Sequence, residues 1–331
     1  MPRLLQVHPL FFVFTVLLRS QPTPDACPVF TPDEGIARIT PKDRIFRFEG
    51  GYVAVVNEVR LDTDGSPVAY HPLNKGTTNL CNGLDPIIDE KRISDKKAGS
   101  PCFAAVRAAI DAGWRRETSP GFCVYGFYAP GTNSKDLKCN AWGGTFGTGE
   151  IPRQGQDDPA PGFFVSITAA RNPGRAPEDS QRRYLDSDRT PYVVIPGALV
   201  RSKSLPASGL AWAWNPKSNR SAAAVFGDTQ SKFGEISVAF AQKIEKGRID
   251  PITPSALTGE SPIPWPYGKR STGEVRLTGS PSGPVVLVYF SQALSAPLAS
   301  YDSDTIESAT APFLQRLGGS HLQSCLKLLL R

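Results

Sequence analysis

Histidine is scarce in this sequence: three occur among 331 residues, namely His8, His71 and His321. Because His8 lies in a predicted leader segment, at most two imidazoles remain, which excludes a zinc site built on three of them. No Gly-x-Ser-x-Gly segment is present, so nothing indicates a nucleophilic serine of the α/β-hydrolase kind. These absences favour hydrolytic chemistry by carboxylates, and we expect no metal and no cofactor.

The sequence also lacks any methionine after Met1 and any closely spaced cysteine pair of the redox type. The single methionine is Met1, which excludes a methionine-rich adaptable groove. No Cys-x-x-Cys pair occurs, so neither a thiol redox motif nor a zinc ribbon is indicated. Glycine and proline, by contrast, are abundant, with 30 and 31 residues. So many helix breakers favour short strands joined by turns.

Residues 1–20 have the pattern of a cleaved secretory signal, in which Arg3 precedes an apolar run at 9–18. This run of ten residues is too short to span a hydrocarbon core of about 30 Å, so an uncleaved anchor is the less favoured alternative. The sequence therefore predicts a secreted, extracellular protein with no membrane partner.

An even number of cysteines follows the predicted leader, which suggests disulfide bonds. The six residues are Cys27, Cys81, Cys102, Cys123, Cys139 and Cys325. The sequence does not choose among the pairings that they allow. Cys325 lies in a short amphipathic segment that we expect outside the main fold, so an arrangement with one free thiol stays open.

Short apolar segments bounded by turn residues recur along the chain and predict strands. They cover residues 37–49, 51–65, 161–170, 191–200, 210–214, 221–227, 274–279 and 284–290. Helical spacing is present at 101–114 and from about Val238 to Gly247. Two stretches without such patterns, 128–160 and 250–272, are predicted surface loops.

Together these elements predict a mainly β protein with a single β-barrel-like domain over residues 27–291. A double-psi barrel is one form that such a domain can take. One or two short helices and long loops complete it. Residues 292–331 are predicted to be an appended C-terminal tail of unknown role, and we expect a monomer.

The most informative segment for chemistry is 221–247. A strand of small residues ends at Asp228, and the next element begins at Glu235. Carboxylates in such positions can face each other across a cleft, and inverting glycosidases separate theirs by about 6.5–9.5 Å. The alternative is structural: Asp228 as a turn residue and Glu235 in the first turn of a helix.

Two further segments collect polar side chains beside predicted strands. Segment 62–72 contains Asp62, Asp64, Tyr70 and His71. It begins like a calcium loop but lacks the required glutamate, so a turn with solvated carboxylates is the alternative to a substrate site. Segment 182–197 contains a second cluster of Tyr184, Asp186 and Asp188. These residues would lie either at the mouth of a barrel or in a capping turn.

Four segments in this order resemble glycoside hydrolase family 75, the secreted chitosanases of fungi and bacteria. They read DTDGSPVAYHP, DDPAPGFFVS, RYLDSDRTPYVVIP and VFGDTQSKFGEIS, and they extend over about 180 residues. Residues 1–35 and 292–331 lie outside the resemblance, and 115–155 departs from the family pattern.

The resemblance implies endo-hydrolysis of β-1,4 glucosamine linkages in chitosan, without a cofactor and with inversion at the anomeric carbon. Its paired carboxylates map onto Asp228 and Glu235. We assign Glu235 as the acid because glutamate has the higher reference pKa, and Asp228 as the base, with the exchanged roles left open. Substrate binding is expected from Asp62, Asp64, Tyr70, His71, Ser166, Tyr184 and Asp186.

The charge balance tests this interpretation. The chain has a net charge of +6, which should repel a polycation such as chitosan at long range. An acidic cleft would have to compensate, and its expected members are Asp62, Asp64, Asp157, Asp158, Asp186 and Asp188. If these residues are scattered, a neutral or acetylated glycan becomes the better substrate.

Two other functions remain as alternatives. A barrel could bind wall polysaccharide without cutting it, in the manner of an expansin, and Asp228 and Glu235 would then be structural. Nucleic-acid binding is disfavoured, because the basic residues form no stripe beyond short clusters such as Arg115-Arg116.

Overall fold

A computed structural model describes most of the chain. The described residues are 27–95, 99–115, 118, 121–130, 139, 144–145, 150–174, 176–270 and 273–331. The predicted leader, residues 1–20, lies outside them, as does much of 128–149.

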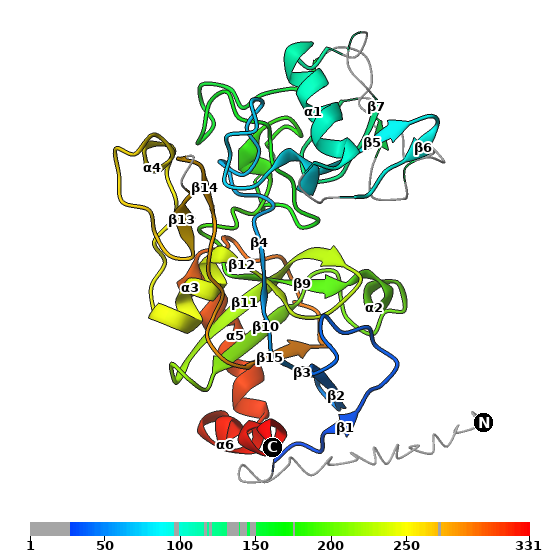
Figure 1. Ribbon diagram of the computed structural model, residues 1–331. Helices are drawn as coiled ribbons and strands as arrows, with labels where there is room; N and C mark the ends of the chain where they lie inside the picture. Colours follow the sequence, from blue (N-terminus) through cyan, green and yellow to red (C-terminus); the bar gives the residue numbers. More distant parts are fainter. Residues whose placement is uncertain are drawn as a thin grey trace, which may run out of the picture.

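The main structural element is a large sheet that curls into a half-barrel (Figure 1). In the described chain it has nine strands, in the order β1 (Thr31–Pro32), β2 (Arg44–Phe48), β3 (Gly51–Val56), β15 (Val285–Phe290), β10 (Leu210–Asn215), β11 (Arg220–Gln230), β9 (Tyr192–Pro196), β12 (Glu235–Ser237) and β4 (Arg60–Asp62). Pairing is antiparallel as far as β11, whereas β9 is parallel to β11 and β4 is parallel to β12. The predicted mainly β, barrel-like fold class is confirmed.

Both faces of this sheet are covered, which explains why β9 and β15 are buried at every position. On one face, alanines of β10 and β11 leave room for Phe240 and Ile244 of helix α3 (Val238–Lys246). On the other face, Trp212 and Trp214 pack with Ile306 of helix α5 (Ser303–Arg316). The two tryptophans are therefore core residues.

Helix α3 confirms the prediction for its segment, and its ends have clear local causes. The Ser237 hydroxyl accepts a hydrogen bond from the Phe240 amide at 3.1 Å, which caps the first turn. Gly247 ends the helix with a φ of 78°, a conformation that glycine adopts without strain.

The C-terminal segment corrects the prediction of an appended tail. Helices α5 and α6 (Leu322–Lys327) pack against the large sheet, and Leu322 and Leu326 belong to its core. Cys325 is joined to Cys27 by a disulfide, so the arrangement with a free thiol is wrong. Apolar side chains on one face of these helices are buried, which is why the segment folds onto the sheet.

A second, smaller sheet forms the upper part of Figure 1, in the order β6 (Lys91–Arg92), β5 (Leu84–Ile88), β7 (Gly121–Val124) and β8 (Gly144–Thr145). Helix α1 (Pro101–Asp111) packs on it, as predicted for this segment, over a core that includes Trp114, Phe122 and Phe164. Disulfides join Cys81 to Cys102 and Cys123 to Cys139. We call this part, residues 69–164, the small-sheet lobe, and the part built on the nine-stranded sheet the large-sheet lobe.

The remaining elements are short. They are α2 (Gly197–Arg201), α4 (Pro254–Thr258), the hairpin of β13 (Tyr267–Lys269) and β14 (Val275–Leu277), and the 3-10 turns Leu80–Asn82, Gln181–Arg183, Gly319–His321 and Leu328–Leu330. The predicted strand at 161–170 is not a regular strand and forms only isolated bridges, Phe127 with Ser166 and Arg153 with Phe164. Of its apolar side chains, Phe164 and Val165 are buried.

The pairing of the cysteines confirms the prediction of disulfide bonds. All six cysteines of the described chain are paired in three disulfides, which is typical of proteins from oxidising compartments. In the described part of the chain, no helix has the length and apolar character needed to cross a membrane.

Candidate active site

The turn after β4 carries the first two carboxylates of the site. Asp62 Oδ1 accepts a hydrogen bond from the Asp64 amide at 2.8 Å, which closes the turn. Gly65 follows with a φ of +81°, and a Cβ there would lie 1.8 Å from the Leu185 carbonyl oxygen. Only glycine fits this position, and its amide donates to Ser166 Oγ at 2.8 Å. The sequence Asp-x-Asp-Gly is therefore explained by a tight turn that fixes Asp62 and Asp64.

Asp228 lies on β11, directly after an irregularity in the pairing with β9. The register shifts between Phe226 and Asp228. A Cβ on the intervening Gly227 would lie 2.3 Å from the Tyr192 ring, so glycine is required there too. Asp228 Oδ1 accepts hydrogen bonds from the amides of Thr229 at 2.7 Å and Ala169 at 3.2 Å. The irregularity thus directs Asp228 toward the 167–171 loop.

Glu235 is the first residue of β12, which pairs in parallel with β4. The preceding Gly234 has a φ of +107°, and its carbonyl accepts a hydrogen bond from the Arg60 amide at 3.0 Å. The alternative that placed Glu235 in the first turn of a helix is wrong, because three strand residues precede α3. Pairing with β4 brings Glu235 to the same edge of the sheet as Asp62.

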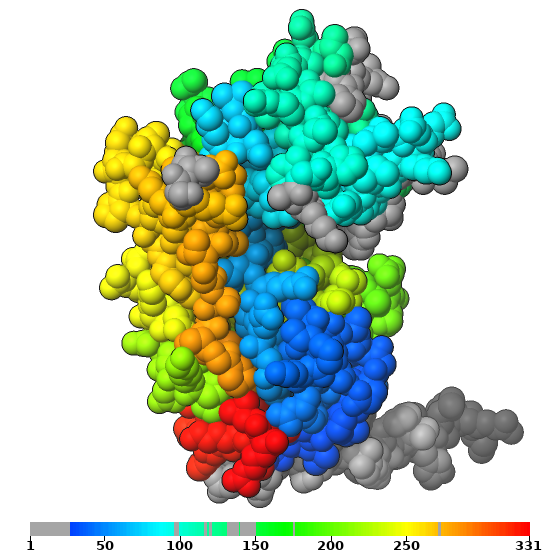
Figure 2. Space-filling model, viewed as in Figure 1, coloured from blue at the N-terminus to red at the C-terminus, as the bar shows by residue number. Residues whose placement is uncertain are grey.

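Two neighbouring pockets share Asp64 as a wall residue, and we treat them as two arms of one cleft. The first pocket has a volume of about 630 Å³ and is lined by Asp64 and Asp228. The second has a volume of about 750 Å³ and is lined by Asp62, Asp64 and Glu235. We call them the Asp228 arm and the Glu235 arm. Figure 2 shows the surface hollowed between the cyan residues of the small-sheet lobe and the green residues of the large-sheet lobe.

Burial and mutual repulsion shift the acidity of these carboxylates. Burial raises the pKa of Asp64 well above its usual value, and the negative charges of Asp62, Asp228 and Glu235 raise it further. The Tyr70 hydroxyl donates to Asp64 Oδ1 at 2.6 Å and opposes this effect in part. Asp64 is therefore the carboxyl group through which the charges of the two arms influence each other.

Asp228 is affected in the same way. Burial raises the pKa of its carboxyl group to about 8, and the charge of Asp62 contributes, while the amides of Thr229 and Ala169 act in the opposite direction. Burial likewise raises the pKa of Asp62 to about 6. Asp228 therefore carries a proton at neutral and mildly acidic pH, which is the state a general acid requires.

Two buried tyrosines, Tyr70 and Tyr192, form hydrogen bonds with Asp64. Tyr192, on β9, donates its hydroxyl to the Asp64 carbonyl oxygen at 2.7 Å. Tyr70 is buried, contacts Asp64 and lines the Glu235 arm. The sequence analysis placed Tyr192 only in a buried strand, because its side-chain partner comes from a segment 128 positions away.

Four other predicted binding residues line neither arm, namely His71, Ser166, Tyr184 and Asp186. His71 is half-buried, its ring packs edge-on against Phe163 at 4.7 Å, and its Nδ1 accepts from the Leu73 amide. Ser166 is fully buried and holds the Gly65 turn. Tyr184 is buried, and the Arg171 guanidinium lies 4.5 Å from the centre of its ring. Ser166 and Tyr184 instead support neighbours of the cleft: Ser166 binds the Gly65 turn, and Tyr184 packs against Arg171.

The expected acidic lining is only partly present. Asp186 and Asp188 form a separate pair in which Asp188 accepts hydrogen bonds from the hydroxyls of Ser66 and Tyr267. Asp158 accepts from the Ser180 hydroxyl. Four of the six aspartates named in the sequence analysis line neither arm, namely Asp157, Asp158, Asp186 and Asp188.

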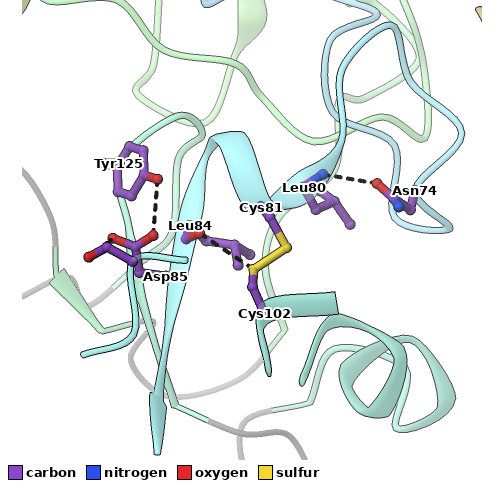
Figure 3. Close-up of a disulfide and its surroundings, with 8 residues drawn as sticks. Asn74, Leu80, Cys81, Leu84, Asp85, Cys102 and Tyr125 are labelled. Carbon is purple, nitrogen blue, oxygen red and sulfur yellow. Dashed lines mark hydrogen bonds between the residues drawn. A yellow bond between two sulfur atoms is a disulfide. The ribbon is translucent and has the colours of Figure 1, made fainter. Parts of the chain in front are cut away.

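Sequence reasoning missed the basic side chains of the Asp228 arm. Arg92, Arg171 and Arg201 line it together with Tyr125. Figure 3 shows the Tyr125 hydroxyl pointing at Asp85, to which it donates at 3.3 Å, close to the Cys81–Cys102 disulfide. Each arginine comes from a different element or loop, and no local pattern marks such residues in a sequence.

The described residues offer no metal site as a guide to function, and similarity to known proteins offers no family. In the described ranges, no three His, Cys, Asp or Glu side chains are grouped so that they could hold a metal ion. The chain matches no protein-family model, and no curated protein is significantly similar to it.

Proposed function

We propose that the protein is a glycoside hydrolase that cleaves β-1,4 linkages in an amino-sugar polysaccharide of the chitosan type. The observation that carries the proposal is the convergence of Asp228 and Glu235, from separate strands, on two arms of one cleft that meet at Asp64. A polysaccharide chain lying along the cleft would pass both carboxylates. The substrate class rests on the resemblance to family 75.

In the proposed reaction Asp228 is the general acid and Glu235 is the general base. This exchanges the roles assigned from the sequence, because the raised pKa of about 8 keeps the Asp228 carboxyl protonated. Asp228 gives its proton to the glycosidic oxygen as the bond from that oxygen to the anomeric carbon breaks. Glu235 removes a proton from the water that attacks the anomeric carbon from the opposite side, which inverts its configuration.

Asp64 acts as a positioning residue between the pair. Its charge, when present, opposes ionisation of its neighbours, and Tyr70 and Tyr192 fix it in place. The arrangement resembles other sites in which carboxylates close together do not all ionise, so that one retains a proton near neutral pH.

The proposal includes secretion. The three disulfides and the predicted leader at 1–20 both fit an extracellular enzyme, and wall polysaccharides are found outside cells. Asp228 and Glu235 remain candidates for a structural role if the protein binds such a polymer without cutting it.

The test measures reducing ends released from chitosan. Asp228→Asn and Glu235→Gln should each lower the rate about 10²- to 10⁴-fold, because an amide cannot transfer the proton. Glu260→Gln, on an exposed loop after α4, is the matched control and should keep full activity. If the wild type binds chitosan but releases no ends, the expansin-like function replaces the proposal.

Azide separates the two roles. A small anion can replace the activated water when the base is removed, so azide should partly rescue Glu235→Ala and should not rescue Asp228→Ala. Rescue of Asp228→Ala alone would restore the assignment made from the sequence. More than about a tenth of wild-type activity in both amide variants would remove the pair from the mechanism.

A further inference from the structure

The two arms of the cleft differ in the charge of their walls. Three arginines line the Asp228 arm, and among the described residues its carboxylates are Asp64 and Asp228. The Glu235 arm has the opposite balance, with one arginine, Arg60, and four carboxylates, Glu58, Asp62, Asp64 and Glu235. Because Asp64 lines both, this change of sign occurs at the point where the catalytic pair is proposed to act.

Two arginines of the Asp228 arm, Arg92 and Arg171, are held in place by contacts within the protein. Arg171 lies over the Tyr184 ring, and its Nη1 donates to the Ala169 carbonyl at 3.3 Å. Arg92 forms an ion pair with the buried Asp85, which offsets its charge. Arg201 is exposed in the last turn of α2. Even with Arg92 neutralised, two positive charges remain at the wall of this arm.

The carboxylates of that arm do not cancel these charges. Burial raises the pKa of both Asp228 and Asp64, which reduces the negative charge that these two groups carry. An ammonium group placed in the Asp228 arm would therefore lie beside Arg171 and Arg201, while the described carboxyl groups of the wall attract it less than fully ionised ones would. Like charges brought together at a binding surface reduce affinity and can select against a partner.

We propose, on the basis of the proposed function, that the cleft divides its substrate by charge. The Asp228 arm takes a sugar unit that carries no ammonium group, and the Glu235 arm takes cationic glucosamine units. In a partially acetylated chitosan, the unit without an ammonium group is N-acetylglucosamine. The bond cleaved then lies between an N-acetylglucosamine unit and a glucosamine unit.

The experiment compares two polymers, one fully deacetylated and one partially acetylated, and determines the sugar at each end of the products by mass spectrometry. The wild type should cleave the partially acetylated polymer faster. Its products should carry N-acetylglucosamine at one type of end and glucosamine at the other. Arg201→Glu should shift the ratio of the two rates toward the deacetylated polymer by about threefold to tenfold.

The control is Arg248→Glu, which makes the same change of net charge at an exposed site paired only with Asp250, away from both arms. It should leave the ratio and the product ends unchanged. Arg201→Gln, which removes the charge without reversing it, should give a smaller shift in the same direction.

Three outcomes decide the matter. Glucosamine at both types of end, or an unchanged ratio in a folded Arg201→Glu variant, overturns the charge division while leaving the hydrolase intact. Release of products from neither polymer overturns the hydrolase and this inference together. A shift by Arg201→Glu but not by Arg248→Glu supports the division of the cleft.

Discussion

The two lobes are stabilised in different ways. The large-sheet lobe buries apolar side chains on both faces of a sheet whose central strands are five to eleven residues long. The small-sheet lobe has strands of two to five residues, an aromatic core and two disulfides. The proposed catalytic carboxylates belong to the regular strands of the first lobe, whereas Arg92 and Tyr125 belong to the second. The walls of the cleft thus come from two differently stabilised parts of the molecule.

The largest expected effect tests the large-sheet lobe. Phe240 of α3 is completely buried against β10 and β11. Phe240→Ala should lower the free energy of unfolding by about 3–5 kcal/mol, because it removes apolar burial and leaves a cavity. Denaturant unfolding followed by tryptophan fluorescence measures the loss. Leu73→Ala, at a side chain that is 52% exposed, is the control and should change stability by less than about 0.5 kcal/mol.

The next effect tests the small-sheet lobe. Cys81 and Cys102 are 21 positions apart, and the double serine variant should lose about 3 kcal/mol of local stability through loop entropy. Amide hydrogen exchange should accelerate in β5 and β7 and remain slow in β10. KM should rise more than kcat falls, because the catalytic strands stay intact. Equal loss of protection in β10 would show that the lobes unfold as one unit.

A third prediction concerns the junction of the lobes, where Asp188 binds Ser66 and Tyr267. Burial and the charge of Asp188 raise the pKa of Asp186 to about 8. Between pH 4 and 8 the folded state therefore binds more protons than the unfolded state, so the free energy of unfolding should fall as pH rises. Asp186→Asn should reduce this fall by about 1–2 kcal/mol between pH 5 and 8, given about 1.4 kcal/mol per pKa unit and partial exposure.

The control for the pH experiment is Asp179→Asn, which removes the same charge from an exposed position in the same loop. Its stability should follow the wild-type pH dependence. A wild-type protein that becomes more stable from pH 5 to pH 8 would contradict the raised pKa of Asp186.

The smallest effect returns to the large-sheet lobe. Asp302 Oδ1 accepts a hydrogen bond from the Thr305 amide at 2.8 Å and caps α5. Asp302→Ala should cost about 1 kcal/mol in the free energy of unfolding. Asp304→Asn, two residues further along in the first turn of α5, should cost less, because it changes only an interaction with the helix dipole. Equal costs would mean that charge, rather than the cap, stabilises this end.

The fold was predictable where the signal is local. Val285–Phe290 and Leu210–Asn215 are strands because β-branched and aromatic residues dominate them, and α3 was placed by its spacing and Gly247. Helix α5 was not predicted. Pro312 lies inside it, and a proline normally costs a helix about 3 kcal/mol, so the pattern reads as broken. Packing of Ile306 and Phe313 against the sheet outweighs that cost.

The site divides in the same way. Asp64, Asp228 and Glu235 became candidates because each lies in a local segment that resembles family 75. Arg92, Arg171 and Arg201 were not, because they come from three remote segments and meet only in the folded chain. Asp186 and Asp188 looked like cleft residues in the sequence, yet hydrogen bonds to Ser66 and Tyr267 direct Asp188 elsewhere. Long-range partners of this kind leave no periodic trace.

The bond between Cys27 and Cys325 has a consequence for the order of events during biosynthesis. Its cysteines are 298 positions apart, so at about 5–20 residues per second roughly 15–60 s separate their synthesis. During that interval Cys81, Cys102, Cys123 and Cys139 all become available, and each can react with the waiting thiol of Cys27. Because a wrong bond formed early must be exchanged later, maturation should depend on thiol–disulfide exchange in the compartment where the chain folds.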